Sequence, residues 1–484
     1  MEEIDASLVT QKSIRGIFAL TSRTLVVQII SFVSSLLLTI FLSPSVFGVF
    51  FVVSAIIAFF SYFSDIGLAA ALIQKKEVVT NEDLKTTFTI QQCLVLVLVF
   101  GAFILISPVA NFYKLDASGI FLFQALIISF FLSSLKTIPS VILERSLNFD
   151  KLVIPQIIET IFFNITAVLL AINGFGITSF TIAVLARGFS GLLAIYIVSP
   201  WRIRIGFSRK SAKKLLSFGV PFQANSFLAL LKDDLLIAYI GKVLPLSEVG
   251  FIGFAQKWAF TPLRLIMDNI IRITFPSFSR LQDEKEILGR GVEKTLFASS
   301  FLIFPSLVGL VLLSPYFVNL IPKYSKWEPA LLSLSFFCLN AALSSVSTPL
   351  TNALNAIGKI KITLYLMIFW TISTWILTPL FIVLFGFNGV ALASAVISLS
   401  IVIVILIVKK IIRFNLFDSI FYPAVSAFIM GAVLFVINPL FIRNFLSLGI
   451  TVIFGAILYI VIMFCFARTR ILEDLRLVKA NLFK

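Results

Sequence analysis

The chain alternates long apolar runs with short polar joints from one end to the other. Runs of about 20 residues are long enough to cross a hydrocarbon core ~30 Å thick, and charged or Pro- and Gly-rich joints mark where they end. The predicted spans are residues 16–42, 45–73, 85–107, 118–143, 152–172, 177–199, 215–241, 247–279, 292–313, 328–355, 361–384, 389–411, 417–437 and 443–466. This pattern predicts an all-α polytopic membrane protein with about fourteen transmembrane helices.

Composition supports this class. Of 484 residues, 59% are hydrophobic and 13% are charged, with a mean hydropathy of +1.07. A soluble domain has roughly 45–50% apolar and about 25% charged residues. The first sixteen residues are acidic and polar, and no small-residue cleavage site follows a short apolar core. We therefore expect no removable signal peptide.

Basic residues in the joints predict the orientation. If the N-terminus is cytoplasmic, the inner segments carry about 27 Lys and Arg residues and the outer segments about five. Because positive charge accumulates on the cytoplasmic side, we predict a multi-pass protein of the plasma or inner membrane with both termini cytoplasmic. The same asymmetry accounts for most of the net charge of +16, so no nucleic-acid partner is expected.

A weak internal repeat indicates two lobes. A shift of 202 positions places "LSPSVFGVF" (42–50) on "LPLSEVGFI" (244–252), and it matches Ser45 with Ser247 and Gly48 with Gly250. The basic joint "WRIRIGFSRKSAKK" (201–214) lies between the repeats. This joint is typical of a loop that contacts anionic lipid headgroups, and a partner-binding linker is the alternative.

The repeat and the basic joint together predict the domain organisation. Repeated bundles are a transporter architecture in which two halves rock about a site near the bilayer midplane. The predicted parts are an N-terminal lobe of six spans (1–200), the basic cytoplasmic linker (201–214), a C-terminal lobe of six spans (215–413), and two extra spans with a tail (414–484).

Twelve charged residues fall in the interiors of the predicted spans, away from the joints. They are Arg23, Lys136, Arg187, Lys232, Lys257, Arg264, Arg272, Asp65, Glu159, Asp233, Asp234 and Asp268. A charge at the bilayer centre costs roughly 2.5–3.5 kcal/mol on insertion scales, so these groups should face one another or water. For Arg187 and Glu159, in adjacent spans, we favour a structural ion pair. Lys136 is expected to extend toward a span end.

The eighth span carries the clearest polar stripe. Lys257, Thr261, Arg264, Asp268 and Arg272 follow one another at intervals of 4, 3, 4 and 4 residues. At 100° per residue they stay within about 80° of one helix face, and they extend along about 22 Å of it.

Spans one, two and seven carry further polar positions. Span two has a polar face that ends in Asp65, and span seven has Asn225 and Lys232 on one face, close to Asp233 and Asp234. The 202-residue shift pairs Arg23 with Asn225. We therefore predict that spans one, two, seven and eight line a central cavity between the lobes, whereas internal ion pairs that only join helices are the alternative.

Metal and cofactor chemistry is not expected. The chain has no histidine, and its three cysteines lie in apolar runs without CxxC spacing. We predict no metal site, no cofactor and no disulfide framework.

Four stretches resemble a known family. They are "LSPSVFGVF" at 42–50, "RSLNFDKL" at 145–152, "DDLLIAYIGKVLPLSEVGFIGFAQK" at 233–257 and "FPSFSRLQDEKE" at 275–286. With the fourteen spans, they make the chain similar to the polysaccharide transporter (Wzx-type O-antigen flippase) family of the multidrug/oligosaccharidyl-lipid/polysaccharide (MOP) superfamily. The resemblance implies a flippase that carries polyprenyl-diphosphate-linked oligosaccharide from the inner to the outer leaflet.

The same resemblance implies roles for the charged residues. Asp234 matches the family's acid before "LLI", and Arg23, Lys257, Arg264 and Arg272 match its cavity cations. Our hypothesis is that these cations, with Lys232, bind the diphosphate. Asp65, Asp233, Asp234 and Asp268 would balance the charge, bind sugar hydroxyls or couple ions. The expected partners are the lipid-linked oligosaccharide, the bilayer and a polysaccharide polymerase machinery.

Other functions remain alternatives. A peptidoglycan lipid-precursor flippase or a drug exporter of the same superfamily would share the fold, but the cationic stripe favours a phosphorylated cargo. A membrane glycosyltransferase, polymerase or ligase usually needs a sizeable outer loop, and the longest outer joint here is about fifteen residues. The Lys-Asp-Asp sequence is expected inside a helix, away from any loop. We therefore predict a transporter and not an enzyme or a scaffold.

Overall fold

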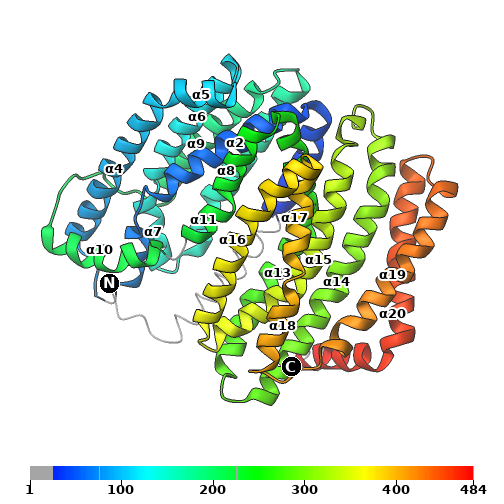
Figure 1. The fold of residues 1–484 in the computed structure, drawn as a ribbon. Helices are drawn as coiled ribbons and strands as arrows, with labels where there is room; N and C mark the ends of the chain where they lie inside the picture. Colours follow the sequence, from blue (N-terminus) through cyan, green and yellow to red (C-terminus); the bar gives the residue numbers. More distant parts are fainter. Residues whose placement is uncertain (1–25, 76, 225–226, 483–484) are drawn as a thin grey trace. The chain divides into compact units, whose positions relative to one another are not determined.

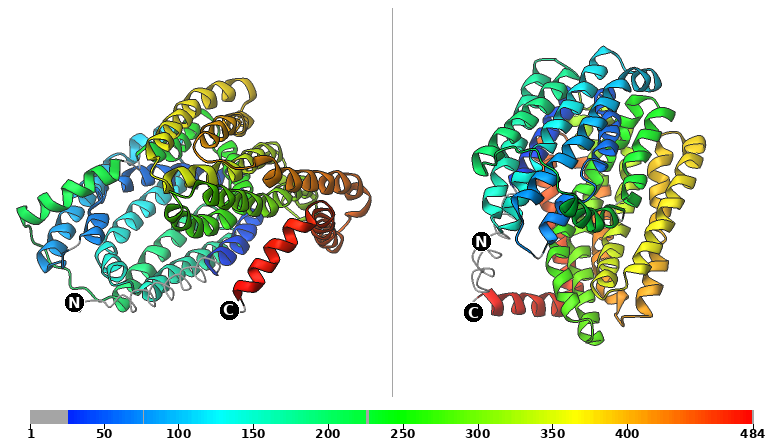
Figure 2. Two further views of the ribbon diagram at one scale, coloured as in Figure 1. Left: turned by 90° about the horizontal axis from the view of Figure 1, so that it is seen from below. Right: turned by 90° about the vertical axis from the view of Figure 1, so that its left-hand side faces the viewer.

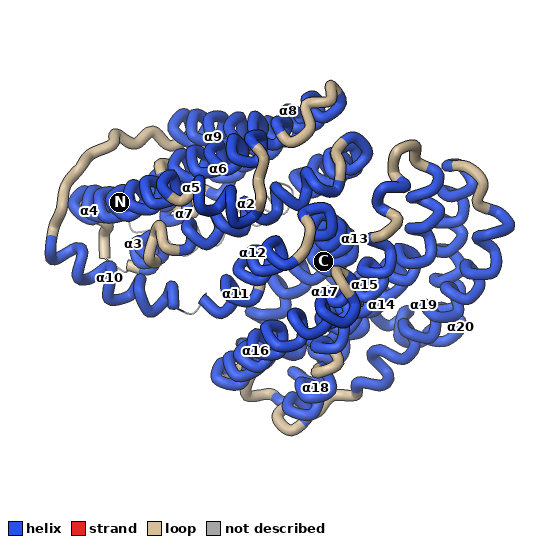
Figure 3. The backbone as a smooth tube through the Cα atoms, turned by 45° about the horizontal axis from the view of Figure 1, so that its top comes forward, coloured by secondary structure: helices blue, strands red, loops and turns tan. Residues whose placement is uncertain are grey.

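The computed structural model describes residues 26–75, 77–224 and 227–482, and helices make up most of these ranges (Figure 3). No β-strand occurs in these ranges. The predicted all-α polytopic fold class is confirmed. The chain divides into two compact units, unit 1 (Met1–Gly250) and unit 2 (Phe251–Lys484), which are described separately.

Unit 1 consists of membrane-length helices connected by shorter ones (Figure 1). Its helices are Val26–Phe41, α2 (Pro44–Tyr62), α3 (Leu68–Gln74), α4 (Asn81–Ile104), α5 (Ile106–Tyr113), α6 (Ala117–Ser134), α7 (Thr137–Arg145), α8 (Phe149–Ile172), α9 (Thr178–Val198), α10 (Arg209–Ala224), α11 (Phe227–Lys232) and α12 (Asp234–Val243). Helix α9 packs on α8 and α6, α6 also packs on α2 and α4, and α12 packs on α2.

Unit 2 contains the longest helices. They are α13 (Leu246–Arg280), which begins at the end of unit 1, α14 (Lys285–Leu320), the 3-10 turn η1 (Ser325–Trp327), α15 (Ala330–Ala356), α16 (Ile360–Phe385), α17 (Asn388–Ser398), α18 (Ile401–Lys409), α19 (Leu416–Phe441) and α20 (Phe445–Leu482). Helix α14 packs on α15 and α19, and α19 packs on α20. A kink at Ala467 (φ −127°, ψ 30°) turns the last part of α20 in a new direction (Figure 2).

The observed helices account for the predicted spans. Among the described residues, eleven helices are long and apolar enough to cross a membrane, and Val26–Phe41 is a shorter apolar helix. The remaining two predicted spans correspond to the α10–α12 series and to α13. The helices α10 to α12 are each too short to cross a membrane alone, and α13 is too polar to be counted among the eleven. The two compact units divide after Gly250. The predicted lobe boundaries at residues 200 and 214 therefore stay a prediction.

Several predicted spans are wrong as continuous helices. The span 85–107 is interrupted at Leu105, 118–143 is divided between α6 and α7, and 389–411 is divided between α17 and α18. The span 45–73 breaks after Tyr62, because Ile66 (φ 45°) and Gly67 (φ 72°) adopt left-handed backbone conformations that end α2 before α3 begins. The span 215–241 breaks at Asp233, between α11 and α12. The Lys-Asp-Asp sequence therefore lies at a helix joint and not inside a helix. Asp234 occupies the first turn of α12, where the helix dipole favours a negative charge.

Two positions of the predicted repeat meet in a reciprocal backbone contact. A Cβ atom on Gly48 of α2 would collide with the carbonyl of Leu246, and one on Gly250 would collide with the carbonyl of Pro44. The positions 44 and 246, and likewise 48 and 250, are 202 residues apart. The glycine of each repeat thus lies against the equivalent backbone carbonyl of the other repeat. Only glycine permits so close an approach of two backbones.

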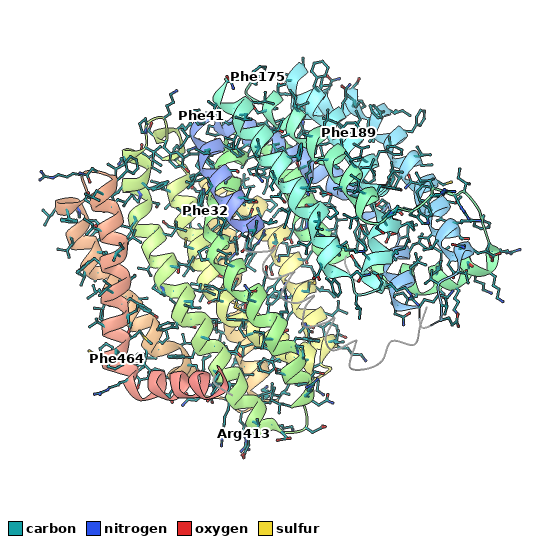
Figure 4. All side chains as sticks on the ribbon, turned by 180° about the vertical axis from the view of Figure 1, so that it is seen from behind. Phe32, Phe41, Phe175, Phe189, Arg413 and Phe464 are labelled. Atoms are coloured by element: carbon teal, nitrogen blue, oxygen red, sulfur yellow. The ribbon has the colours of Figure 1, made fainter. Side chains whose placement is uncertain are left out.

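Phenylalanine covers much of the outer surface. Figure 4 shows Phe32, Phe41, Phe189 and Phe464 on their helices and Phe175 in the loop between α8 and α9, and each of these side chains is exposed. A soluble protein rarely exposes so many large apolar side chains, whereas a lipid-facing surface requires them.

Candidate functional site

The predicted polar stripe of α13 lies on an exposed face in unit 2. Lys257, Arg264, Asp268 and Arg272 are exposed, and Thr261 between them is partly buried. The other side of the helix is packed into the protein through Ala255, Ala259, Leu263 and Met267, which are all buried. The 3.6-residue period of the sequence therefore separates a cationic face from a packing face over about four turns.

Three of the four charged side chains of the stripe are unpaired among the described residues. Within the described part of unit 2, no ion pair joins Lys257, Arg264 or Asp268 to a side chain of opposite charge. The Thr261 hydroxyl donates to the carbonyl of Lys257 at 2.7 Å, so it is used within the helix. No described residue accepts a hydrogen bond from the Arg264 guanidinium, so its five N–H groups are available for an anion.

The candidate residues of span seven meet at the joint between α11 and α12 in unit 1. Lys232 Nζ lies 3.9 Å from Asp233 Oδ1, and their side chains are 39% and 67% exposed. Asp234 is half-buried at the start of α12. An ion pair this exposed contributes little to stability, so these groups are open to water or to a ligand.

Asp65 has a local structural role. Its carboxylate accepts hydrogen bonds from the Ala69 N–H at 3.2 and 3.1 Å and so satisfies the first turn of α3. The prediction that Asp65 continues the polar face of span two is wrong, because α2 ends at Tyr62.

The sequence also predicted that all these residues share one cavity. Arg23 and Asn225 lie outside the described residues, and Asp65, Lys232, Asp233 and Asp234 belong to unit 1 whereas the stripe belongs to unit 2. Convergence of the two groups on one cavity stays a prediction.

A second charged group lies inside unit 1. Glu159 of α8 accepts from Lys136 Nζ at 2.6 Å and lies 3.6 Å from Arg187 Nε. The predicted Glu159–Arg187 pair is confirmed. Lys136 does not extend toward a span end. It lies between α6 and α7, and its ammonium group contacts the Glu159 carboxylate instead. Gly191 makes room for this carboxylate, since a Cβ there would collide with the Glu159 side chain.

Sequence reasoning missed an ionic cluster around the loop before α4. Lys75 Nζ lies 2.5 Å from Asp83 Oδ2, and Thr80 and Asp83 form a capping box at the start of α4. The spacing T-x-x-D before an apolar run is the signal that predicts such a cap. Lys214 of α10 pairs with Glu77, and this contact holds the pKa of the Glu77 carboxyl below its usual range.

Solved structures with this fold are membrane transporters. The lipid II flippase MurJ, in its inward closed conformation, matches with a TM-score of 0.77 at 17% identity, over 93% of this chain and 99% of that one. An inward-facing multidrug resistance MATE family transporter of the MOP superfamily matches with a TM-score of 0.60 at 15% identity, over 81% of this chain and 98% of that one. This chain therefore shares the fold of these two transporters.

Sequence comparison then identifies the family. The model of the polysaccharide biosynthesis protein family matches residues 37–332, and the chain belongs to this family. The lipopolysaccharide biosynthesis protein WzxC of Escherichia coli (strain K12) is 27% identical over 67% of this chain and 66% of its own length. The teichuronic acid biosynthesis protein TuaB of Bacillus subtilis (strain 168) is 25% identical over 82% of this chain and 84% of its own.

Proposed function

We propose that this protein is a flippase that moves polyprenyl-diphosphate-linked oligosaccharide from the cytoplasmic to the outer leaflet by alternating access. The family and the fold shared with these transporters support a transporter of lipid-linked polysaccharide units and not an enzyme. The observation that carries the proposal is the exposed cationic stripe of α13. Three cations on a membrane-length helix are too costly to expose to lipid, so they indicate a hydrated path for an anionic head.

Arg264 is the central group of the proposed diphosphate site. It lies about 10 Å from the level of Lys257 and about 12 Å from that of Arg272 along the helix axis. A guanidinium binds phosphate oxygens in a bidentate manner, and a lysine ammonium acts as a point charge. Lys257 and Arg272 would thus receive the diphosphate before and after Arg264. The polyprenyl tail would stay among the lipids.

The acids have complementary roles in this proposal. Asp268 lies one helical turn from both Arg264 and Arg272, so it balances their charge in the empty state and accepts hydrogen bonds from sugar hydroxyls. Lys232, Asp233 and Asp234 are open to ligand at their helix joint, where they would contact the sugars. Arg23 would contribute a further cation from the first span.

The test is translocation of a lipid-linked oligosaccharide in proteoliposomes, scored by the access of an external sugar-modifying enzyme. We expect Arg264→Ala to lower the rate roughly 10- to 100-fold, the range of a lost charge-assisted hydrogen bond. Arg264→Lys should retain part of the rate. Arg413→Ala is the matched control, because Arg413 is exposed in unit 2 outside the stripe (Figure 4).

The outcomes separate the alternatives. Full transport by Arg264→Ala would assign the stripe to structure, and no transport by the intact protein would reject this cargo. A peptidoglycan precursor is the second candidate cargo, because the fold resembles MurJ and both lipids share the diphosphate. Drug resistance that appears or persists with Arg264→Glu would favour a drug exporter.

A further inference from the structure

The segment that joins α9 to α10 exposes large apolar side chains. Residues 199–208 form no helix and arc from one helix to the next (Figure 3). Ile203, Ile205 and Phe207 in this segment are 54%, 82% and 66% exposed. Moving side chains of this size out of water is favourable, so a neighbouring phase or molecule should cover them.

The segment is nevertheless attached to α4, within unit 1. The Gly206 N–H donates to Thr89 Oγ1 and the Ser208 N–H donates to Thr86 Oγ1, each at 3.0 Å. The ring of Trp201 packs on Phe88 with 5.1 Å between the ring centroids. The backbone of the segment is thus anchored on α4, and this anchored part of α4 is the base from which the apolar side chains project.

The position of this base indicates the height of the segment in the membrane. The exposed large apolar side chains of α4 begin at Leu96. Thr89 lies seven residues earlier, which is about 10 Å along the helix axis. The hydrocarbon core ends near the first lipid-facing side chains, and the headgroup layer adds roughly 6 Å on each side. The segment therefore lies close to the headgroup layer.

Its charge is complementary to that layer. Arg202, Arg204, Arg209 and Lys210 are all exposed. No Asp or Glu occurs between Ser199 and Lys232. The alternation of arginine with Ile203 and Ile205 lets an irregular segment direct apolar groups to acyl chains and guanidinium groups to phosphates.

We propose that residues 201–210 form a docking surface for anionic phospholipids of the adjacent leaflet. Ile203, Ile205 and Phe207 enter the boundary between headgroups and acyl chains, and Arg202, Arg204 and Arg209 bind lipid phosphates. A bound lipid covers the apolar residues and satisfies the cations at once. This proposal does not depend on the transported cargo.

The experiment places a fluorescent probe at Ile205. In a background with Cys93→Ser and Cys465→Ser, Ile205→Cys is labelled with an environment-sensitive NBD group, and the full chain is reconstituted in mixed phosphatidylcholine and phosphatidylglycerol vesicles. The buried thiol of Cys338 stays in place. Spin-labelled phosphatidylglycerol and spin-labelled phosphatidylcholine are compared as quenchers at equal mole fraction.

We expect the anionic quencher to be at least twofold more effective. Replacing Arg202, Arg204 and Arg209 by Gln should remove this preference, since each cation near an anionic surface is worth roughly a fivefold change in lipid affinity. Replacing the exposed Lys409 and Lys410 by Gln is the control for a general loss of charge, and it should leave the preference intact. Equal quenching by the two lipids would overturn the proposal. Quenching by aqueous iodide but by neither lipid would also overturn it and would indicate a protein partner.

Discussion

At the scale of single residues, the charges inside unit 1 and those on α13 have opposite environments. Glu159 and Lys136 have side chains that are 13% and 15% exposed and lie 2.6 Å apart. Lys257 and Arg264 are exposed. A buried charge persists only when a partner compensates for its lost hydration, whereas an exposed charge within a membrane-length helix needs water or an anion. The Lys136–Glu159 pair therefore has a structural role, whereas Lys257 and Arg264 are the residues for which we expect a role in transport.

Glu159→Gln tests this distinction. The substitution leaves the Lys136 ammonium without a counterion, and we expect the protein to lose about 3 kcal/mol of unfolding free energy. Thermal unfolding in detergent should show a clear fall in Tm. The matched control is Asp233→Asn, which removes a carboxylate from an exposed pair with Lys232 and should cost less than about 0.5 kcal/mol. Equal effects of the two substitutions would contradict this assignment.

At the scale of helices, the sequence predicted where chains cross the membrane better than where helices break. The apolar runs gave the spans because length and composition decide insertion. The break after Tyr62 was missed because Asp65 was interpreted as part of a helical polar face, although Ser64, Asp65 and Gly67 together are typical of a turn. The break at Asp233 was missed because charges inside an apolar run were interpreted as a cavity face. The stripe of α13 was predicted to lie on one helix face, and its four charged residues are all exposed, because an unbroken helix preserves the 3.6-residue period.

The contact of α2 with the start of α13 depends on glycine. In Gly48→Ala, the new Cβ would collide with the backbone carbonyl of Leu246, so the helices must move apart. We expect a loss of about 1–3 kcal/mol in unfolding free energy, measured as a lower Tm. Gly101→Ala in α4 is the matched control, because nothing lies within 4 Å of its Cβ position. That variant should be neutral or slightly more stable, since alanine favours a helix interior. A Gly48→Ala protein as stable as Gly101→Ala would show that the contact can relax.

At the scale of the whole molecule, the distribution of basic residues predicts a cytoplasmic N-terminus and C-terminus. Single cysteines test this in a background without the exposed Cys93 and Cys465. We expect Lys323→Cys to react in intact cells with a thiol reagent that cannot cross the membrane, because its joint is predicted to be outside. Lys361→Cys should react only after the cells are opened. The reverse pattern would invert the predicted orientation and would assign the docking segment to the outer leaflet.

The same orientation gives the direction in which the membrane potential acts on the proposed cargo. A potential that is negative inside favours outward movement of an anionic head by ~2.3 kcal/mol per charge and per 100 mV when the charge crosses uncompensated. We expect an imposed potential of about 100 mV to raise the initial rate of translocation roughly threefold or more in proteoliposomes, with the pH held equal on both sides. The matched measurement uses the same vesicles with a pH gradient and no potential. A rate that follows only the pH gradient would contradict this prediction and would assign the driving force to proton uptake by an acid such as Asp234. A rate that follows neither would mean that the cations of the stripe neutralise the diphosphate and move with it, because a compensated charge does no work in the field.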